Sequence, residues 1–203
     1  MTFIEQANEK RIDGIARAVC SLLPQGSMTM LDVGCGDGTL AQRVAMQRPG
    51  FSFEGVEVVI PEDTCIPMQH YDGTTLPFPD KSFDGVLCVD MLHHTEMPIA
   101  ILREACRVAK QYVVVKDHIC DGLIDRSILT CMDWLGNVGT GVPLPFRFLS
   151  SQQWHDVFAA LPYKETGRIE PLQYWGWPMR MIVDRQFHFV SLLENPGAGH
   201  LAD

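Results

Sequence analysis

A glycine-rich stretch directly after an apolar run constrains this chain more than any other feature of its sequence. The apolar run covers residues 28–33, glycines follow at Gly34, Gly36 and Gly38, and an amphipathic run covers residues 39–47. A turn without Cβ atoms lets a ligand approach the backbone, and the helix after it presents unpaired N–H groups to an anionic ligand atom. The pattern predicts a strand, a ligand-binding turn and a helix at the start of a βαβ unit.

The spacing of these glycines distinguishes the turn from two other ligand-binding loops. The dinucleotide fingerprint G-x-G-x-x-G would place glycine at position 39, where this chain has Thr39. A P-loop would continue as G-K-[ST], which does not follow here. The glycine spacing makes an NAD(P)-dependent oxidoreductase a weaker alternative. The longer helix that this class of enzyme has after its second strand is also missing from the sequence pattern.

Strand-like and helix-like segments alternate along the chain. Apolar runs bounded by turn residues predict seven strands, over residues 28–33, 52–59, 69–72, 83–89, 112–116, 164–170 and 187–193. Apolar residues at helical spacing predict helices over residues 5–23, 39–47, 100–108, 123–135 and 151–161. This alternation favours a parallel sheet covered on both faces, and the last two strands fit a closing hairpin. No linker or repeat interrupts the order, so we expect a single domain over residues 1–203.

Charge and cysteine content weigh against several classes of function. The chain has 25 acidic and 16 basic residues, a net charge of -9, and no Lys/Arg cluster, which disfavours nucleic acid as a partner. No apolar run reaches the ~20 residues of a membrane helix, and residues 1–11 are too polar for a signal peptide. The seven cysteines form no C-x-x-C pair, which argues against a disulfide framework or a zinc knuckle. We expect a cytoplasmic monomer or homodimer.

Several sequence blocks follow one another in a fixed order along the chain. The turn reads DVGCGDG over residues 32–38, and the later blocks are LPFPDKSFDGV at 76–86, VDMLHH at 89–94 and LREACRV at 102–108. Together they resemble class I S-adenosylmethionine-dependent methyltransferases of the ubiquinone/menaquinone-methyltransferase-like subgroup over about residues 28–117. The resemblance implies a Rossmann-like, doubly wound α/β fold with a mostly parallel seven-stranded sheet. Residues 28–117 would form the cofactor-binding core, and residues 118–203 the substrate-side lid, helix and closing strands.

The same resemblance implies which residues would hold S-adenosyl-L-methionine and its product S-adenosyl-L-homocysteine. Asp32 would face the methionine ammonium, and the backbone of Gly34, Cys35 and Gly36 would line the cofactor. Later strand ends would complete the site, with Glu57 and Val58 beside the ribose, Asp72 and Gly73 near the adenine amine, and Asp90, Met91 and His94 beside the methionine moiety. A carboxylate at Glu57 can accept hydrogen bonds from both ribose hydroxyls.

The chain departs from the family pattern in two places. The helix usually found between strands two and three is replaced by a short Pro-containing link at residues 59–67, so residues 64–68 are candidates for one wall of the adenine pocket. The usual Gly-Gly turn before strand five is replaced by Ala109, Lys110 and Gln111. We therefore expect the adenine pocket to be built differently here.

Three residues are candidates for chemistry at the carboxyl ends of the strands. Asp117 and His118 end the fifth strand, where an aspartate can orient an imidazole that acts as a base. Neighbouring residues of an extended strand point to opposite faces, so the two should pair only if the strand has already ended. His93 is the third candidate, although one imidazole of the His93–His94 pair could instead serve a backbone carbonyl. A histidine pair without a third ligand in register is no metal site, so we expect no metal.

The kind of molecule that accepts the methyl group is predicted from the aromatic residues in the last third of the chain and from the absence of motifs for base methylation. Aromatic residues are frequent after residue 130, among them Trp134, Phe148, Trp154, Trp175 and Trp177. Residues 133–137, followed by residues 139–145, resemble a lid. No N-P-P-[YF] block or Pro-Cys pair for base methylation is present. The sequence favours a small apolar or aromatic acceptor, methylated on oxygen rather than carbon. The alternative outside the enzymes is a non-catalytic methyltransferase-like binding domain.

Overall fold

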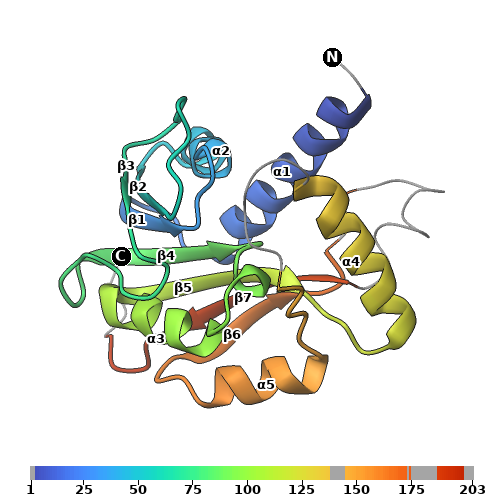
Figure 1. Ribbon diagram of the computed structural model, residues 1–203. Coiled ribbons are helices and arrows are strands. Elements are labelled where there is room, and N and C mark those ends of the chain that lie inside the picture. The colour runs from blue at the N-terminus through green and yellow to red at the C-terminus, as the bar shows by residue number, and fades with distance from the viewer. Residues whose placement is uncertain (1–2, 138–144, 173, 175–186, 199–203) are drawn as a thin grey trace.

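Seven strands form one mixed sheet in the order β3-β2-β1-β4-β5-β7-β6 (Figure 1). The computed structural model describes residues 3–137, 145–172, 174 and 187–198. The strands are β1 (Met28–Val33), β2 (Phe51–Glu57), β3 (Met68–His70), β4 (Phe83–Val89), β5 (Ala109–His118), β6 (Lys164–Ile169) and β7 (His188–Glu194). The first five run parallel, and β7 is antiparallel to both β5 and β6. The predicted parallel sheet with a closing antiparallel pair is confirmed.

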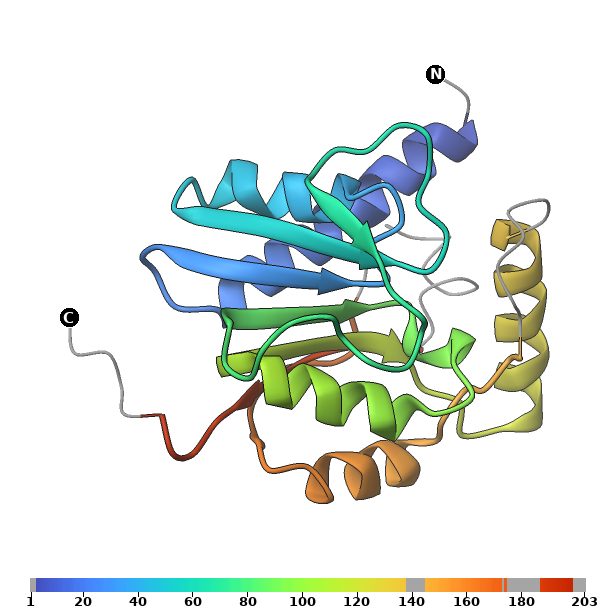
Figure 2. The ribbon, with the colours of Figure 1, turned by 60° about the vertical axis from the view of Figure 1, so that its left-hand side comes forward.

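Helices cover both faces of this sheet. α1 (Phe3–Leu22) and α2 (Thr39–Gln47) lie on one face, and α3 (Pro98–Val108) and α5 (Ser151–Ala159) lie on the other (Figures 1 and 2). The short 3₁₀ helix η1 (Leu92–His94) follows β4. α4 (Leu123–Asn137) stands beyond the carboxyl ends of the parallel strands, as Figure 2 shows. The fold is therefore doubly wound, with one helix placed over the edge where ligands bind in such sheets.

Three consecutive valines of β5 illustrate why the central strands need cover on both faces. Val113, Val114 and Val115 are all fully buried. Because successive strand side chains point to opposite faces, Val113 and Val115 pack in the cluster that contains residues of α3 and α5. Val114 packs in the cluster that contains residues of α1 and α2.

Several predicted boundaries are confirmed, and others move for local reasons. β1, α2 and β4 have the predicted bounds. α3 starts two residues earlier than predicted because Pro98 fits the first turn of a helix. α5 starts at the predicted residue, where Ser150 and Gln153 form a capping box. β5 is longer than the predicted 112–116, because its first residue, Ala109, pairs with Phe83.

The link between β2 and β3 contains no helix, as predicted. It runs alongside the glycine turn instead, where Cys65 N–H donates to the Asp37 carbonyl at 2.7 Å. A Cβ on Gly38 would lie 2.5 Å from Ile66 Cγ1. The link therefore packs directly on the turn that the sequence predicts as the cofactor loop.

No helix among the described residues is long and apolar enough to cross a membrane.

Candidate functional site

The order of the strands places the candidate site. The chain winds in one direction from β1 to β3 and in the other from β4 to β5, so β1 and β4 lie side by side at a reversal of strand order. Open α/β sheets bind ligands at such a reversal, outside the carboxyl ends of the strands. The glycine turn, η1 and the Asp117–His118 pair all follow or end strands at this edge.

The glycine turn has the backbone that its residues predict. Gly34, Gly36 and Gly38 have φ values of 66°, 56° and 82°, in the left-handed region where side chains are disfavoured. A Cβ on Gly34 would lie 2.8 Å from the Cβ of Met91, so this position also lacks room for one. A Cβ on Gly36, by contrast, would have no neighbouring atom within 4 Å. The middle of the turn is therefore uncovered, and the ligand contact predicted there stays a prediction.

Glu57, at the end of β2, braces this turn. Its Oε2 accepts a hydrogen bond of 2.8 Å from Gly36 N–H, and its Oε1 accepts one of 2.8 Å from Val58 N–H. Each carboxylate oxygen has a further lone pair. Glu57 therefore holds the loop in shape and keeps the capacity to accept from a sugar hydroxyl.

Asp32 is a buried carboxylate beside the turn. Its exposed fraction is 2%, and no described residue donates a hydrogen bond to it. Burial, together with the negative charge of Glu57, raises the pKa of Asp32 to about 7. A buried carboxylate without a donor is costly unless a cation or donor is supplied from outside. Asp32 therefore fits the ammonium of the cofactor that the resemblance implies.

Met91 connects the glycine turn to a cluster of histidines. It contacts Gly34 on one side, and the next residue, Leu92, donates its N–H to Asp117 Oδ2 at 3.2 Å. Residues 93 and 94 continue this segment as η1. The two parts of the predicted site are thus joined through four consecutive residues.

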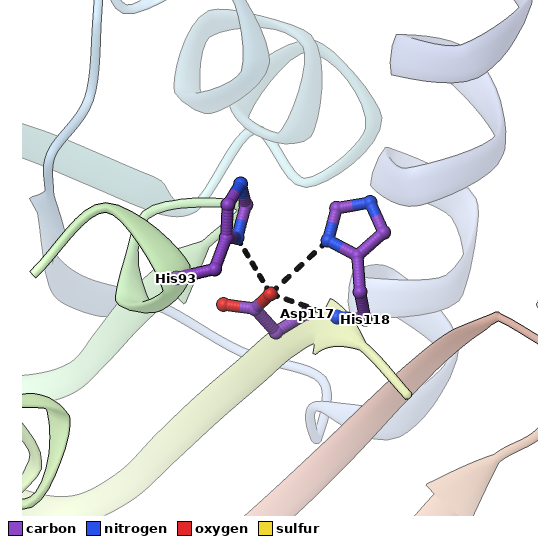
Figure 3. A group of neighbouring side chains, drawn as sticks. All are labelled: His93, Asp117 and His118. Atoms are coloured by element: carbon purple, nitrogen blue, oxygen red, sulfur yellow. Dashed lines mark hydrogen bonds and ion pairs between the residues drawn. The ribbon is translucent and has the colours of Figure 1, made fainter. Parts of the chain in front are cut away.

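Figure 3 shows how His93, Asp117 and His118 meet. Asp117 Oδ1 lies 2.7 Å from His93 Nδ1 and 3.1 Å from His118 Nδ1, and it accepts from His118 N–H at 2.8 Å. The prediction that Asp117 and His118 would pair only beyond the strand end is wrong. β5 continues through His118, and the Asp117 carboxylate folds back along the backbone to its neighbour. His93 Nδ1 is held by Asp117 rather than by a backbone carbonyl, and the same alternative for His94 stays a prediction.

The charges of this cluster are coupled. Burial opposes charge on His93, but Asp117 and Asp133 overcome it and raise the pKa of His93 to about 10. Burial and the nearby Lys116 lower the pKa of His118. Burial alone would raise the pKa of Asp117, yet His93 and His118 hold it well below the usual range. At neutral pH the cluster therefore holds a cationic His93, an ionised Asp117 and a neutral His118.

Asp133 of α4 joins the cluster from the opposite side. Its Oδ1 lies 3.6 Å from Nε2 of His93 and 3.6 Å from Nε2 of His94. Two sets of three residues bring their potential ligand atoms within 4.8 Å of one another: His93, Asp117 and His118, and His93, His94 and Asp133. Asp133 thus supplies a potential third ligand beside the histidine pair, and the expectation of no metal stays a prediction.

A second charged group lies under the same edge. Asp90, with a φ of 51°, accepts from Arg11 at 2.6 Å and pairs with Lys116, whose side chain is fully buried. Burial lowers the pKa of Lys116 and would raise that of Asp90, but Lys116 and Arg11 hold the pKa of Asp90 well below its usual range. His188 Nδ1 lies 3.4 Å from the Lys116 amine. The Asp90 carboxylate thus pairs with two cations, Arg11 and Lys116. The predicted contact with the cofactor would therefore be made by the backbone of Asp90.

The residues predicted near the adenine, Asp72 and Gly73, follow β3. Asp72 is exposed, and its Oδ1 accepts from the N–H groups of Thr74 and Thr75 at 2.8 Å each, which lowers its pKa. Gly73 has a φ of 79°, and a Cβ there would lie 3.5 Å from Val58. Val58 is 44% exposed. Asp72, Gly73 and Val58 therefore gather beside Glu57, while the adenine role stays a prediction.

Some predicted substrate residues fall outside the cluster or outside the described chain. Trp154 is a core residue, 2% exposed, whose indole N–H donates to the His118 carbonyl at 2.8 Å. Phe148 does reach the cluster and stacks on His93 with ring centroids 5.5 Å apart. Trp134 is 54% exposed on α4. Residues 139–144 of the predicted lid, Trp175 and Trp177 lie outside the described residues.

Sequence reasoning missed four residues of this region as site members: Arg11, Lys116, Asp133 and His188. Lys116 precedes the predicted Asp117–His118 pair and Asp133 begins the predicted lid, but neither was assigned a role at the site. Arg11 and His188 have no local signal, because each reaches the site from an element distant in sequence. Lys116 could have been predicted as a site residue, because it is a charged residue in an otherwise apolar strand.

Comparisons with known proteins agree with the architecture. Residues 31–114 match a family model described as a methyltransferase domain. The magnesium protoporphyrin IX methyltransferase of Synechocystis PCC 6803, solved with bound SAH, has the same fold with a TM-score of 0.62. The two share 13% identity, and the match covers 96% of this chain and 88% of that one.

Two curated proteins are similar in sequence over part of their length. The 2-methyl-6-phytyl-1,4-hydroquinone methyltransferase of Synechocystis sp. is 30% identical over 155 residues, which is 68% of this chain and 44% of that protein. The 27-O-demethylrifamycin SV methyltransferase of Amycolatopsis mediterranei is 29% identical over 120 residues, 53% of this chain and 43% of that protein. The match thus spans less than half the length of either relative.

Proposed function

Because this chain belongs to the class I S-adenosylmethionine-dependent methyltransferases of the ubiquinone/menaquinone-methyltransferase-like type, we propose that it methylates a small apolar or aromatic acceptor, on oxygen rather than carbon. One observation carries the proposal. The open glycine turn with its donorless carboxylate, Asp32, is joined through Met91 to a buried histidine cluster. A cationic cofactor and a proton acceptor would thus meet at one edge of the sheet.

The cofactor would lie over the glycine turn. S-adenosylmethionine supplies an electrophilic methyl group on a positively charged sulfur. Asp32 would bind its ammonium, Glu57 its ribose, and the backbone of Gly34, Cys35 and Gly36 would line it. Asp90 and Met91 would contact the methionine moiety through their backbone, with His94 beside them. Val58 would lie beside the ribose, and Asp72 and Gly73 at the adenine end.

His118 would act as the base that takes the acceptor's proton. Its Nδ1 lies 3.1 Å from Asp117, so this nitrogen donates and Nε2 keeps the lone pair. No described residue forms a hydrogen bond to Nε2. Asp117 would orient the ring, and His93 would hold Asp117 in place from the other side. A base of this kind contributes about 10²–10⁴-fold to rate where the acceptor must lose a proton.

The surroundings of the cluster support an aromatic acceptor. Phe148 stacks on His93 and lies edge-on to His118 with ring centroids 5.8 Å apart. The two curated relatives are named as methyltransferases of 2-methyl-6-phytyl-1,4-hydroquinone and of 27-O-demethylrifamycin SV. We propose residues 118–203 as the acceptor-binding part and residues 28–117 as the cofactor-binding part.

A turnover assay with a panel of phenols, hydroquinones and carboxylic acids tests this proposal. We expect methylated product and S-adenosylhomocysteine in equal amounts from at least one phenolic acceptor. His118→Gln should lower kcat by about 10²–10⁴-fold without changing the affinity for S-adenosylhomocysteine. His155→Gln, on an exposed histidine of α5, is the matched control and should leave kcat unchanged. Cofactor binding with no turnover on any acceptor would instead favour the non-catalytic alternative.

A further inference from the structure

We propose that His93, His94 and Asp133 bind a divalent transition-metal ion of the zinc type, and that this ion holds an oxygen atom of the acceptor. The three side chains come from η1 and from α4, two elements on opposite sides of the histidine cluster. The role toward the acceptor rests on the proposed methyltransferase function. The metal site itself rests only on geometry.

The distances are those between ligands of one ion. Asp133 Oδ1 lies 3.6 Å from Nε2 of His93 and 3.6 Å from Nε2 of His94. An N–H···O hydrogen bond would be shorter, at about 2.7–3.2 Å. Two ligands of a tetrahedral ion with metal–ligand bonds of about 2.1 Å lie roughly 3.4 Å apart. The spacing between these atoms is thus close to what one ion needs.

Asp117 holds the His93 ring in the way that a carboxylate commonly holds a metal-binding imidazole. Its Oδ1 lies 2.7 Å from His93 Nδ1, so Nδ1 donates and Nε2 is left to face Asp133. A carboxylate behind the imidazole is the common support of such ligands, because it fixes the tautomer and raises the basicity of the free nitrogen. Leu92 N–H in turn holds the other oxygen of Asp117.

The neighbouring set of His93, Asp117 and His118 fits an ion less well. Asp117 Oδ1 lies 2.7 and 3.1 Å from the two Nδ1 atoms, which are hydrogen-bond distances. These nitrogens are therefore used in donating to Asp117. The set that includes Asp133 is the one with ligand atoms at ligand spacing.

The chemistry of the ligands indicates the ion and its use. Two imidazoles and one carboxylate suit zinc-type ions, whereas Mg²⁺ prefers oxygen ligands. Three protein ligands leave a fourth position open, as in catalytic zinc sites. A hydroxyl of the acceptor bound there would lose its proton to His118 Nε2. The oxygen–carbon bond would then form as the sulfur–carbon bond breaks, with that electron pair going to sulfur.

Metal titration of the full chain, stripped with a chelator, tests the site without any turnover. Zn²⁺ binding is followed by calorimetry and Co²⁺ binding by visible absorption, at mildly alkaline pH because a proton on His93 competes with the ion. We expect one ion per chain, visible bands of tetrahedral Co²⁺ that Zn²⁺ abolishes, and no displacement by Mg²⁺. Asp133→Asn and His94→Gln should abolish these bands, and Asp117→Asn should weaken Zn²⁺ affinity by about 10–100-fold.

His155→Gln is again the control, because His155 is exposed and lies 3.5 Å from Asp156. The proposal is overturned if the wild-type chain binds neither ion stoichiometrically, or if binding survives Asp133→Asn and His94→Gln. Circular dichroism of each variant shows that the fold is kept. Binding of S-adenosylhomocysteine is measured on the same samples, so a missing metal site with intact cofactor binding removes this inference and leaves the proposed function standing.

Discussion

A Cβ on Gly34 would lie 2.8 Å from the Cβ of Met91, so the first glycine of the turn and the residue that precedes η1 are in direct contact. This contact aligns two parts of the proposed site. The turn would hold the cofactor, and the segment that starts at Met91 carries His93 and His94. A change at Gly34 should therefore disturb both parts.

We predict that Gly34→Ala destabilises the protein more than Gly36→Ala. Both positions have positive φ, which costs a residue with a side chain about 1–3 kcal/mol. Only Gly34 also has a neighbour in the way, since no atom lies within 4 Å of a Cβ on Gly36. Urea denaturation of both variants measures the difference. Equal losses would show that the contact with Met91 adjusts without cost.

We predict that Glu57→Gln weakens cofactor binding by about 10–100-fold, because a hydrogen bond to a charged group contributes about 1.5–3 kcal/mol. The new amide NH₂ cannot accept from Gly36 or Val58, both of which donate to the present carboxylate. Titration calorimetry with S-adenosylhomocysteine is the measurement. Glu54→Gln, on the same strand and bonded to Gln69, is the control. An unchanged dissociation constant in Glu57→Gln would remove Glu57 from the cofactor site.

Cofactor affinity should depend on pH through Asp32. The pKa of this carboxyl is raised to about 7 by burial and by Glu57. A bound ammonium favours the ionised form, so the pKa falls on binding. Affinity should therefore be constant above about pH 7 and fall by up to tenfold per pH unit below it. Asp32→Asn should bind more weakly and lose this dependence. A wild-type affinity that is flat between pH 5 and 8 would contradict the assignment.

The buried pair of Asp90 and Lys116 should contribute to stability. Asp90→Asn leaves a fully buried ammonium without its counter-charge, which costs about 3–5 kcal/mol. Asparagine tolerates the positive φ of this residue, so backbone strain adds nothing. Adding Lys116→Met should recover part of the loss. Glu96→Gln, in an exposed pair with Arg147, should cost less than about 1 kcal/mol. Urea denaturation compares the four proteins.

The sequence predicted local features well because they have local causes. Turn residues bound the runs that become β1, α2 and β4, and the blocks from the glycine turn to residue 108 occur at the predicted places on the sheet. The positions of Gly34, Gly36 and Glu57 followed from the same pattern. The missing helix between β2 and β3 was visible as a Pro-containing link.

Contacts between distant elements could not be predicted in this way. Arg11 and Asp90 are 79 residues apart and meet only because α1 crosses the edge of the sheet. Asp133 reaches His93 because of where α4 stands, which depends on packing around Leu129 and Phe148. The third side chain in register with the histidine pair was missed for this reason. The pairing of Asp117 with its neighbour in the chain depends on a side-chain rotamer rather than on strand alternation.

The central claim is that the glycine turn binds S-adenosylmethionine, and calorimetry with S-adenosylmethionine and S-adenosylhomocysteine tests it most directly. We predict micromolar binding of both by the wild-type chain, with loss of binding in Gly36→Val, where a side chain would occupy the open middle of the turn. Asp32→Asn, which keeps the backbone unchanged, should weaken binding as well. No binding by the wild-type chain at millimolar ligand would contradict the account.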